Sequence, residues 1–476
     1  RRRALSVPAR HERRVGAGHP SRPARRRAPR RARRRVRGAD AGMSPERLEL
    51  RALDVHFGRA LVRWSAPELD PVDREVLERL GARLSAELGR QNVCIELPVL
   101  ADEEDWPASE ALRDLLGRSG LLGADGSAPL VLEGDRLYLA RFHDYETRLA
   151  AALVERARDG LLSEEEIATL APRLAALFPG EDDPDWQRVA AATALDRRLA
   201  VIAGGPGTGK TTTVARLLVL LLEQAEAPPR IRLAAPTGKA AARLTESLRD
   251  ARAALEDAGA ASGEILAALP DSASTLHRLL GYRSEANRFV HGAGTPLAAD
   301  VVVVDEASMV DLRLMAQLVA ALPPQARLVL LGDPDQLSSV EAGRVLGDLC
   351  AWTETHAEAD RFTRAGAARL GRLVGSDLDA LGGDAVPPLA DALCILRRSH
   401  RFDAGGALGR FARAVNAGDA SIARAALASG EAGVRAVPDT QALIEIAVAG
   451  YADAVAAAQG GAPEAVLAAF ARFQVL

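Results

Sequence analysis

The segment that most constrains the fold is GGPGTGKTTT at residues 204–213, which lies between an apolar run and a helical stretch. Gly204, Gly209, Lys210 and Thr211 fit the pattern G-x-x-x-x-G-K-[ST], and the preceding run RLAVIAGG predicts a strand. A strand, a glycine loop and a helix in this order bind phosphates through backbone N–H groups and the helix N-terminus. A chance glycine-rich turn would not explain why strand, loop and helix agree, so we expect a nucleotide-binding loop.

Lys210 is also unusual because only two of the 61 basic Lys and Arg residues are lysines, the other being Lys239. Lysine is ordinarily among the commonest residues, so arginine has replaced it wherever the two cations are interchangeable. A phosphate loop needs a compact ammonium between β- and γ-phosphate oxygens, where a planar guanidinium does not fit. The composition therefore marks Lys210 as chemically required and Lys239 as a position of interest.

Length and composition limit the class of protein. A chain of 476 residues is expected to form two to four domains. It contains no run of eighteen apolar residues, so we expect no membrane span. Cys94, Cys350 and Cys394 lack metal-ligand spacing and indicate a reduced, cytoplasmic protein. Residues 1–42 hold 16 arginines against two acidic residues, which predicts a disordered arm, either nucleic-acid-binding or a mis-extended start before Met43.

The order of apolar runs and helical stretches predicts the domains. Apolar strands separated by helices between residues 198 and 340 indicate a doubly wound parallel sheet. Before it, helical stretches at 73–91 and 143–158 flank a hairpin pattern at 130–142, which indicates a small α+β domain without a catalytic cluster. We expect an arm at 1–42, an N-terminal domain and linker at 43–180, an ATPase domain at 181–352, an insertion or linker at 353–390 and the start of a second domain at 391–476.

Polar residues follow the predicted strands at their carboxyl ends, where open sheets bind ligands. We expect Asp305 to hold Mg²⁺ together with Thr211, and Glu306 to orient or deprotonate the attacking water. Gln336 can sense the γ-phosphate, although an ordinary polar turn uses the same residue types. Gln187 can recognise adenine or be a plain surface residue. The expected nucleotide-binding residues are Gln187, Gly204, Gly205, Pro206, Gly207, Thr208, Gly209, Lys210, Thr211 and Thr212.

Two further segments, APTGKAAARL and STLHRLLG, place small polar groups and one cation at strand or helix ends. Thr237, Lys239, Thr275 and His277 suit contacts to a single-stranded nucleic-acid backbone. The alternative for His277 is a packed or capping histidine, and the sequence leaves both open.

The phosphate loop, APTGKAA, STLHRLLG, VDEASMVD and LGDPDQLSSVEAG occur in an order that resembles superfamily 1 DNA helicases of the 5′-to-3′ branch. LRALDVHF, GRQNVCIELP, PLVLEGDRLYLARF and ALCILRRSHRF followed by ARAVNAGD are similar to the alpha chains of exodeoxyribonuclease V, the RecD family. The resemblance runs from about residue 48 to the end. It implies RecA-like motor domains and an ATP- and Mg²⁺-dependent 5′-to-3′ helicase subunit acting at DNA double-strand breaks in recombinational repair.

The resemblance also implies partners and a further site residue. The chain would assemble with exodeoxyribonuclease V beta and gamma chains through its N-terminal domain, in the bacterial cytoplasm and associated with the nucleoid. Arg401, in RSHRF, would reach ATP from the second motor domain, although a solvated helix or strand end is the alternative. No nuclease constellation is visible, so nuclease activity would belong to the partner.

The family's last motifs, one rich in Gln and Gly and one containing Thr and Arg, have no counterpart before Leu476. We therefore expect a truncated second motor domain. Three hypotheses stay open: a helicase motor subunit incomplete in this sequence, a stand-alone helicase of the same branch, and a nucleotide-gated DNA- or protein-binding subunit that does not translocate.

Overall fold

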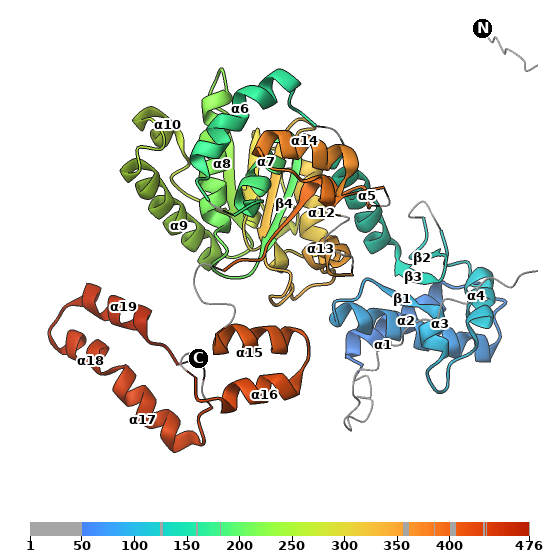
Figure 1. Cartoon of the computed structure of the whole chain (residues 1–476). Helices are drawn as coiled ribbons and strands as arrows, with labels where there is room; N and C mark the ends of the chain where they lie inside the picture. The colour runs from blue at the N-terminus through green and yellow to red at the C-terminus, as the bar shows by residue number, and fades with distance from the viewer. Residues whose placement is uncertain are drawn as a thin grey trace, which may run out of the picture. The chain divides into compact units, whose positions relative to one another are not determined.

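The computed structural model describes residues 50–123, 127–158, 160–180, 182–355, 361–384, 386–399, 406–431, 434 and 436–475 (Figure 1). The arginine-rich arm of residues 1–42 and the predicted site residue Arg401 lie outside this described part of the chain.

The first described domain is a small α+β unit. Its antiparallel sheet has the order β1-β3-β2 and comprises β1 (Cys94–Glu96), β2 (Leu130–Glu133) and β3 (Arg136–Leu139). Leucines from the sheet and from the surrounding helices form one buried cluster. These helices are α1 (Ala52–Trp64), α2 (Pro71–Gly89), α3 (Leu97–Ala101) and α4 (Ser109–Arg118). The helix predicted at 73–91 and the hairpin predicted at 130–142 are thus confirmed.

The second domain is built on a six-stranded sheet of order β11-β4-β8-β7-β5-β6, in which every neighbouring pair is parallel. Its strands are β4 (Leu199–Gly204), β5 (Ile231–Ala235), β6 (Ser274–Thr275), β7 (Val301–Val304), β8 (Arg327–Gly332) and β11 (Leu393–Leu396). Because all strands run the same way, the loops that follow them meet at one edge of the sheet.

Helices cover both faces of this sheet because successive side chains of a strand point to opposite sides. In β7, Val301 and Val303 pack in one buried cluster and Val302 and Val304 in the other. The first face carries α6 (Glu164–Leu177), α7 (Trp186–Asp196), α8 (Lys210–Gln224), α9 (Gly238–Asp257), α10 (Gly263–Ala268) and α14 (Arg364–Val374). The second carries α5 (Ala140–Ala157), α11 (Leu276–Leu279), α12 (Leu312–Ala321) and α13 (Val345–Thr355).

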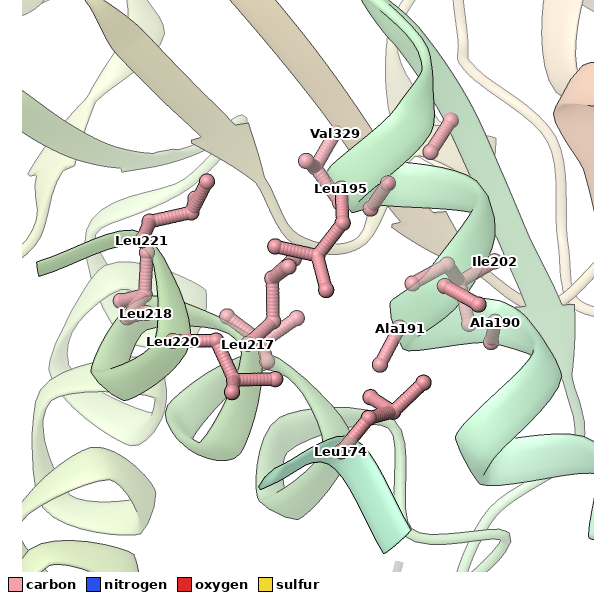
Figure 2. Packing of buried hydrophobic residues seen from close by; sticks show 14 of the residues in the cluster. Leu174, Ala190, Ala191, Leu195, Ile202, Leu217, Leu218, Leu220, Leu221 and Val329 are labelled. Atoms are coloured by element: carbon pink, nitrogen blue, oxygen red, sulfur yellow. The ribbon is translucent and has the colours of Figure 1, made fainter. Parts of the chain in front are cut away.

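Figure 2 shows the first of these clusters from close by, with leucines of α6, α7 and α8 directed toward Ile202 of β4 and Val329 of β8. Three layers of helix, sheet and helix confirm the predicted doubly wound fold.

The strand pairing moves the predicted boundary at residue 391. β11 pairs in parallel with β4, so that Leu393 faces Val201 and Leu396 faces Gly204. The prediction that residues 391–476 begin a second domain is therefore wrong for β11, which is an edge strand of the six-stranded ATPase sheet. An apolar strand pattern indicates burial and does not indicate which sheet the strand joins.

The segment predicted as an insertion, 353–390, also contributes to the core. Leu370, Leu373 and Val374 of α14 are buried in the same cluster as α6 and α7. Arg369 of this helix donates from Nε to Asp196 Oδ2 of α7 at 2.7 Å. A short parallel pair, β9 (Phe362–Thr363) and β10 (Gly382–Gly383), flanks α14. The weak helical pattern of this segment therefore belongs to a core helix and not to a surface insertion.

The boundary predicted near residue 180 shifts as well, because α5 and α6 pack on the ATPase sheet. Arg156 of α5 is buried and donates to the carbonyl oxygens of Leu322, Pro323 and Ala326 at 3.2, 2.9 and 2.7 Å. These carbonyls follow the end of α12, so the guanidinium caps that helix and ties α5 to it.

The described residues from 406 onward contain helices and no strand. They are α15 (Ala407–Asn416), α16 (Ala420–Ala428), α17 (Thr440–Gly450), α18 (Ala452–Gln459) and α19 (Pro463–Arg472). Short 3-10 helices occur elsewhere: η1 (Ser284–Ala286), η2 (Ala307–Met309), η4 (Asp379–Leu381) and η5 (Ala390–Ala392). Within the described ranges, no single helix has the length and apolarity to cross a membrane; α17 and α18 meet that criterion only as a pair bent by 42°, and only by length and composition.

Candidate nucleotide-binding site

A cavity of about 1070 Å³ at the carboxyl edge of the ATPase sheet collects most of the predicted nucleotide-binding residues. Strand β8 lies between β4 and β7, so the phosphate loop and the acidic pair that follows β7 are two strand spacings apart, about 10 Å. This separation leaves room for a polyphosphate between them. The predicted residues that line the cavity are Pro206, Gly207, Thr208, Gly209, Lys210, Thr211, Thr212, Asp305, Glu306 and Gln336.

The phosphate loop depends on glycine at its turn into α8. Gly209 has a φ of +83°, and a Cβ at this position would lie 2.2 Å from Gln187 Nε2. The Gln187 amide donates to Thr208 O at 3.0 Å, so α7 holds the loop from outside. The predicted residue Gln187 therefore contacts the phosphate loop directly, although it does not line the cavity.

Lys210 projects from the first turn of α8 into the loop. Its Nζ donates to Gly205 O at 3.1 Å and also to Gly204 O. Burial lowers the pKa of this ammonium, whereas the negative charges of Asp333, Asp305 and Glu306 act to raise it. The cation is thus partly desolvated and surrounded by carboxylates, which suits a group that neutralises phosphate.

The acidic pair, Asp305 and Glu306, forms a turn directly after β7. The Glu306 N–H donates to Asp305 Oδ1 at 2.9 Å, and Glu306 has left-handed backbone angles of φ 52° and ψ 42°. A residue other than glycine is strained there by about 1–3 kcal/mol, and such strain concentrates at functional sites. Burial raises the pKa of both carboxyl groups, and repulsion from Asp305 raises that of Glu306 further.

Asp305 and Thr211 supply oxygen donors at one cavity, which fits a hard cation such as Mg²⁺. Among the described residues there is no cluster of three or more His, Cys, Asp or Glu side chains that could hold a metal.

Gln336 is exposed at the same cavity and its Nε2 lies 3.3 Å from Asp333 Oδ2. Asp333 is only 4% exposed, and burial raises its pKa. Three residues at this site were absent from the predicted set: Asp333, and also Arg216 and Arg243, which line the cavity from α8 and α9. For Arg216 the available signal was its spacing of four residues, about one turn, from Thr212 of the phosphate loop, because residues one turn apart share a helix face.

The predicted DNA-contacting residues fall into two groups. Thr237 and Thr275 lie just beyond β5 and at the end of β6, which pair in parallel, and their hydroxyls cap α9 and α11. Lys239 is exposed on the first turn of α9. His277 instead lines a separate cavity of about 530 Å³, where its ring lies 5.3 Å from that of Tyr282 and 5.7 Å from that of Phe289.

The chain approaches the phosphate loop again shortly before Arg401. Ser399 Oγ donates to Pro206 O at 3.1 Å. The described part of the segment that leads to Arg401 therefore contacts the nucleotide loop.

These features define a P-loop nucleotide-binding domain, and a family model described as an AAA domain matches residues 187–342. A second model, described as the N-terminal domain of the RecBCD enzyme subunit RecD, matches residues 46–138. The chain thus combines a RecD-type N-terminal domain with an AAA domain.

Similarity to curated proteins agrees with both matches. RecBCD enzyme subunit RecD of Haemophilus influenzae is 39% identical over 297 residues, covering 62% of this chain and 45% of that protein. RecD of Mycolicibacterium smegmatis is 38% identical over 398 residues, covering 78% and 62%. An ATP-dependent RecD2 DNA helicase of Deinococcus radiodurans is 35% identical over 240 residues, covering 46% and 30%. The predicted resemblance to RecD is confirmed, and the chain spans 45–62% of the length of these two RecD relatives.

Proposed function

We propose that this chain is the ATP-dependent helicase subunit of a RecBCD-type enzyme, which couples Mg·ATP hydrolysis to 5′-to-3′ movement on DNA. The observation that carries the proposal is the convergence of the phosphate loop, the acidic pair and Gln336 on one cavity, in a chain with a RecD-type N-terminal domain. Relatives described as RecD subunits and as an ATP-dependent DNA helicase support it.

In this proposal each residue has a defined role in hydrolysis. Lys210 would exchange its bonds to loop carbonyls for β- and γ-phosphate oxygens, and Thr211 and Asp305 would hold Mg²⁺, which would supply positive charge to the phosphates. Glu306 accepts a proton from the attacking water, and its raised pKa makes it a better base near neutral pH. Gln336 recognises the γ-phosphate.

Two further roles follow from the same proposal. Gln187 would recognise adenine beside the loop that it already contacts. Arg401 would contact the γ-phosphate from the second motor domain, which agrees with the bond from nearby Ser399 to the phosphate loop. Single-stranded DNA would run along the sheet edge at Thr237, Lys239 and Thr275 and reach His277 in the cavity that it lines.

We further propose that the chain acts with beta and gamma subunits at double-strand breaks in recombinational repair, in the bacterial cytoplasm. The N-terminal domain would dock these partners. Leu53, Trp64 and Val72 support this assignment, because these side chains on α1 and α2 are 61–69% exposed. Nuclease activity would reside in a partner.

The test is ATP hydrolysis and unwinding by the full chain with beta and gamma subunits, using duplexes with 5′ or 3′ single-stranded tails. The proposal predicts DNA-stimulated hydrolysis and selective unwinding of the 5′-tailed duplex. Glu306→Gln should retain nucleotide binding and lose about 10²-fold or more in hydrolysis. Wild-type hydrolysis by this variant would refute the assigned base, and nucleotide binding without DNA-stimulated hydrolysis would favour a nucleotide-gated binding subunit instead.

A further inference from the structure

The loop after β8 carries Gln336 and is held at three points by one residue of the N-terminal domain. Ser338 Oγ donates to Gln91 Oε1 at 2.6 Å, and Gln91 Nε2 donates to the carbonyl oxygen of Ser339. The Gly343 N–H donates to the Gln91 carbonyl oxygen at 3.1 Å. Gln91 thus bonds both ends of segment 338–343, from a position almost 250 residues away in the sequence.

Gln91 occupies a backbone position where its residue type is unfavourable. It follows α2 with a φ of +70°, and the bonds Gln91 N–H to Leu88 O and Asn92 N–H to Glu87 O complete a Schellman motif. Glycine is the usual residue at this left-handed position, and a side chain there costs about 1 kcal/mol. A glutamine that breaks the local rule while its side chain makes two bonds to a distant loop indicates a role for that side chain.

Apolar packing does little to hold the loop near Gln336. Leu337 and Val340 are 91% and 90% exposed, so apolar burial does not hold the loop at these positions. On its far side the loop contacts the segment that follows the acidic pair. Leu312 N–H donates to Ala342 O at 3.3 Å, and a Cβ on Gly343 would lie 2.5 Å from the Cβ of Leu312. Segment 338–343, which follows Gln336, therefore contacts Gln91 on one side and the start of α12 on the other.

We propose that Gln91 is a positioning residue that fixes the Gln336 loop against the N-terminal domain, and through it passes the nucleotide state of the cavity to that domain. This inference rests on the proposed function, because Gln336 must respond to the γ-phosphate. When Gln336 moves toward a γ-phosphate in the cavity, Ser338, two residues later, is displaced as well. Gln91 then transmits this displacement to the end of α2. The same contacts hold Gln336 in place during hydrolysis.

The decisive variant is Gln91→Gly in the full chain, because glycine removes both side-chain bonds and relieves the left-handed strain. Its thermal stability should stay close to that of the wild type, because relief of the strain offsets part of the loss of the two bonds. The kcat for ATP hydrolysis should fall about 3- to 10-fold, as expected when the transition state loses a contribution of the size of one net hydrogen bond. Affinity for ADP, which lacks the γ-phosphate, should change less than about 2-fold. Ser338→Ala combined with Gln91→Gly should lower kcat no further than Gln91→Gly alone.

The matched control is Asn92→Ala, because the adjacent Asn92 side chain bonds Glu87 within the same domain at 2.6 Å. This variant should keep the wild-type kcat. Wild-type kcat in Gln91→Gly, or losses that multiply in the double variant, would overturn the inference.

Hydrogen exchange of residues 336–343 supplies a readout that does not require hydrolysis. Exchange should accelerate in Gln91→Gly and remain unchanged in Asn92→Ala. Absence of hydrolysis in the wild type would overturn the proposed function. Unchanged hydrogen exchange in Gln91→Gly would instead overturn the inference that Gln91 fixes the Gln336 loop.

Discussion

Arg369 should be essential to the ATPase domain although it lies in a segment with weak sequence patterning. Its guanidinium forms a two-point contact with Asp196, from Nε to Oδ2 and from Nη2 to Oδ1, each at 2.7 Å. The Asp196 side chain is 1% exposed and also accepts N–H bonds from Leu161 and Leu162 at 3.1 Å. Arg369→Met would remove the only side-chain cation that contacts this carboxylate at salt-bridge distance among the described residues.

Breaking one partner of a buried ion pair ordinarily costs about 3–5 kcal/mol. Since the two backbone N–H groups still bind Asp196, we expect the lower end, about 3 kcal/mol. Arg372, one turn later on α14, is the matched control. It pairs with Glu164 at 3.0 Å, but the two side chains are 51% and 68% exposed, so Arg372→Met should cost less than about 1 kcal/mol.

Calorimetry of the full chain measures this difference. A multidomain chain does not unfold in two states, so the ATPase transition is identified as the one that ADP shifts upward. For a domain of this size about 3 kcal/mol corresponds to a fall of about 6–12 °C in Tm, against less than about 4 °C for the control. Equal shifts for Arg369→Met and Arg372→Met, or a loss confined to a transition that ADP leaves unmoved, would refute the assignment of α14 to the ATPase core.

Three further predictions concern the nucleotide site. Lys210→Arg should fold normally and lose about 10²-fold in ATP hydrolysis, because a planar guanidinium does not replace the ammonium; wild-type turnover would contradict this. Burial raises the pKa of Asp305 and Glu306. As the pH is lowered, hydrolysis should therefore begin to decline at a higher pH than it would if these carboxyl groups had ordinary pKa values. A kcat–pH profile that stays flat down to the ordinary carboxyl range would exclude these groups as the titrating pair. Gly209→Ala should weaken ATP binding about 10-fold in a titration, from left-handed strain of about 1–2 kcal/mol and a clash with an amide of α7. Gly263→Ala, at the start of α10 and outside the cavity, places a Cβ that meets nothing within 4 Å and should bind ATP as the wild type does.

The sequence alone determined the local structures. The phosphate loop, the apolar strand at β7 and the hairpin at 130–142 were predicted where they occur. Each depends on residues within one turn or one strand, where backbone sterics and side-chain period leave few alternatives. The convergence of Asp305 and Gln336 on the phosphate loop was predictable too, because parallel strands deliver their loops to one edge.

Only the tertiary structure decided which distant elements meet. Periodicity predicts that a face is buried but not the surface that buries it, so β11 and α14 were assigned outside the domain that contains them. The contact between Gln91 and Ser338 likewise had no local signal, since a lone glutamine after a helix is ordinarily a surface residue. Such contacts depend on loop closure over hundreds of residues and on which strand edge or hydrogen-bonding group is left unpaired when the rest of the chain has folded.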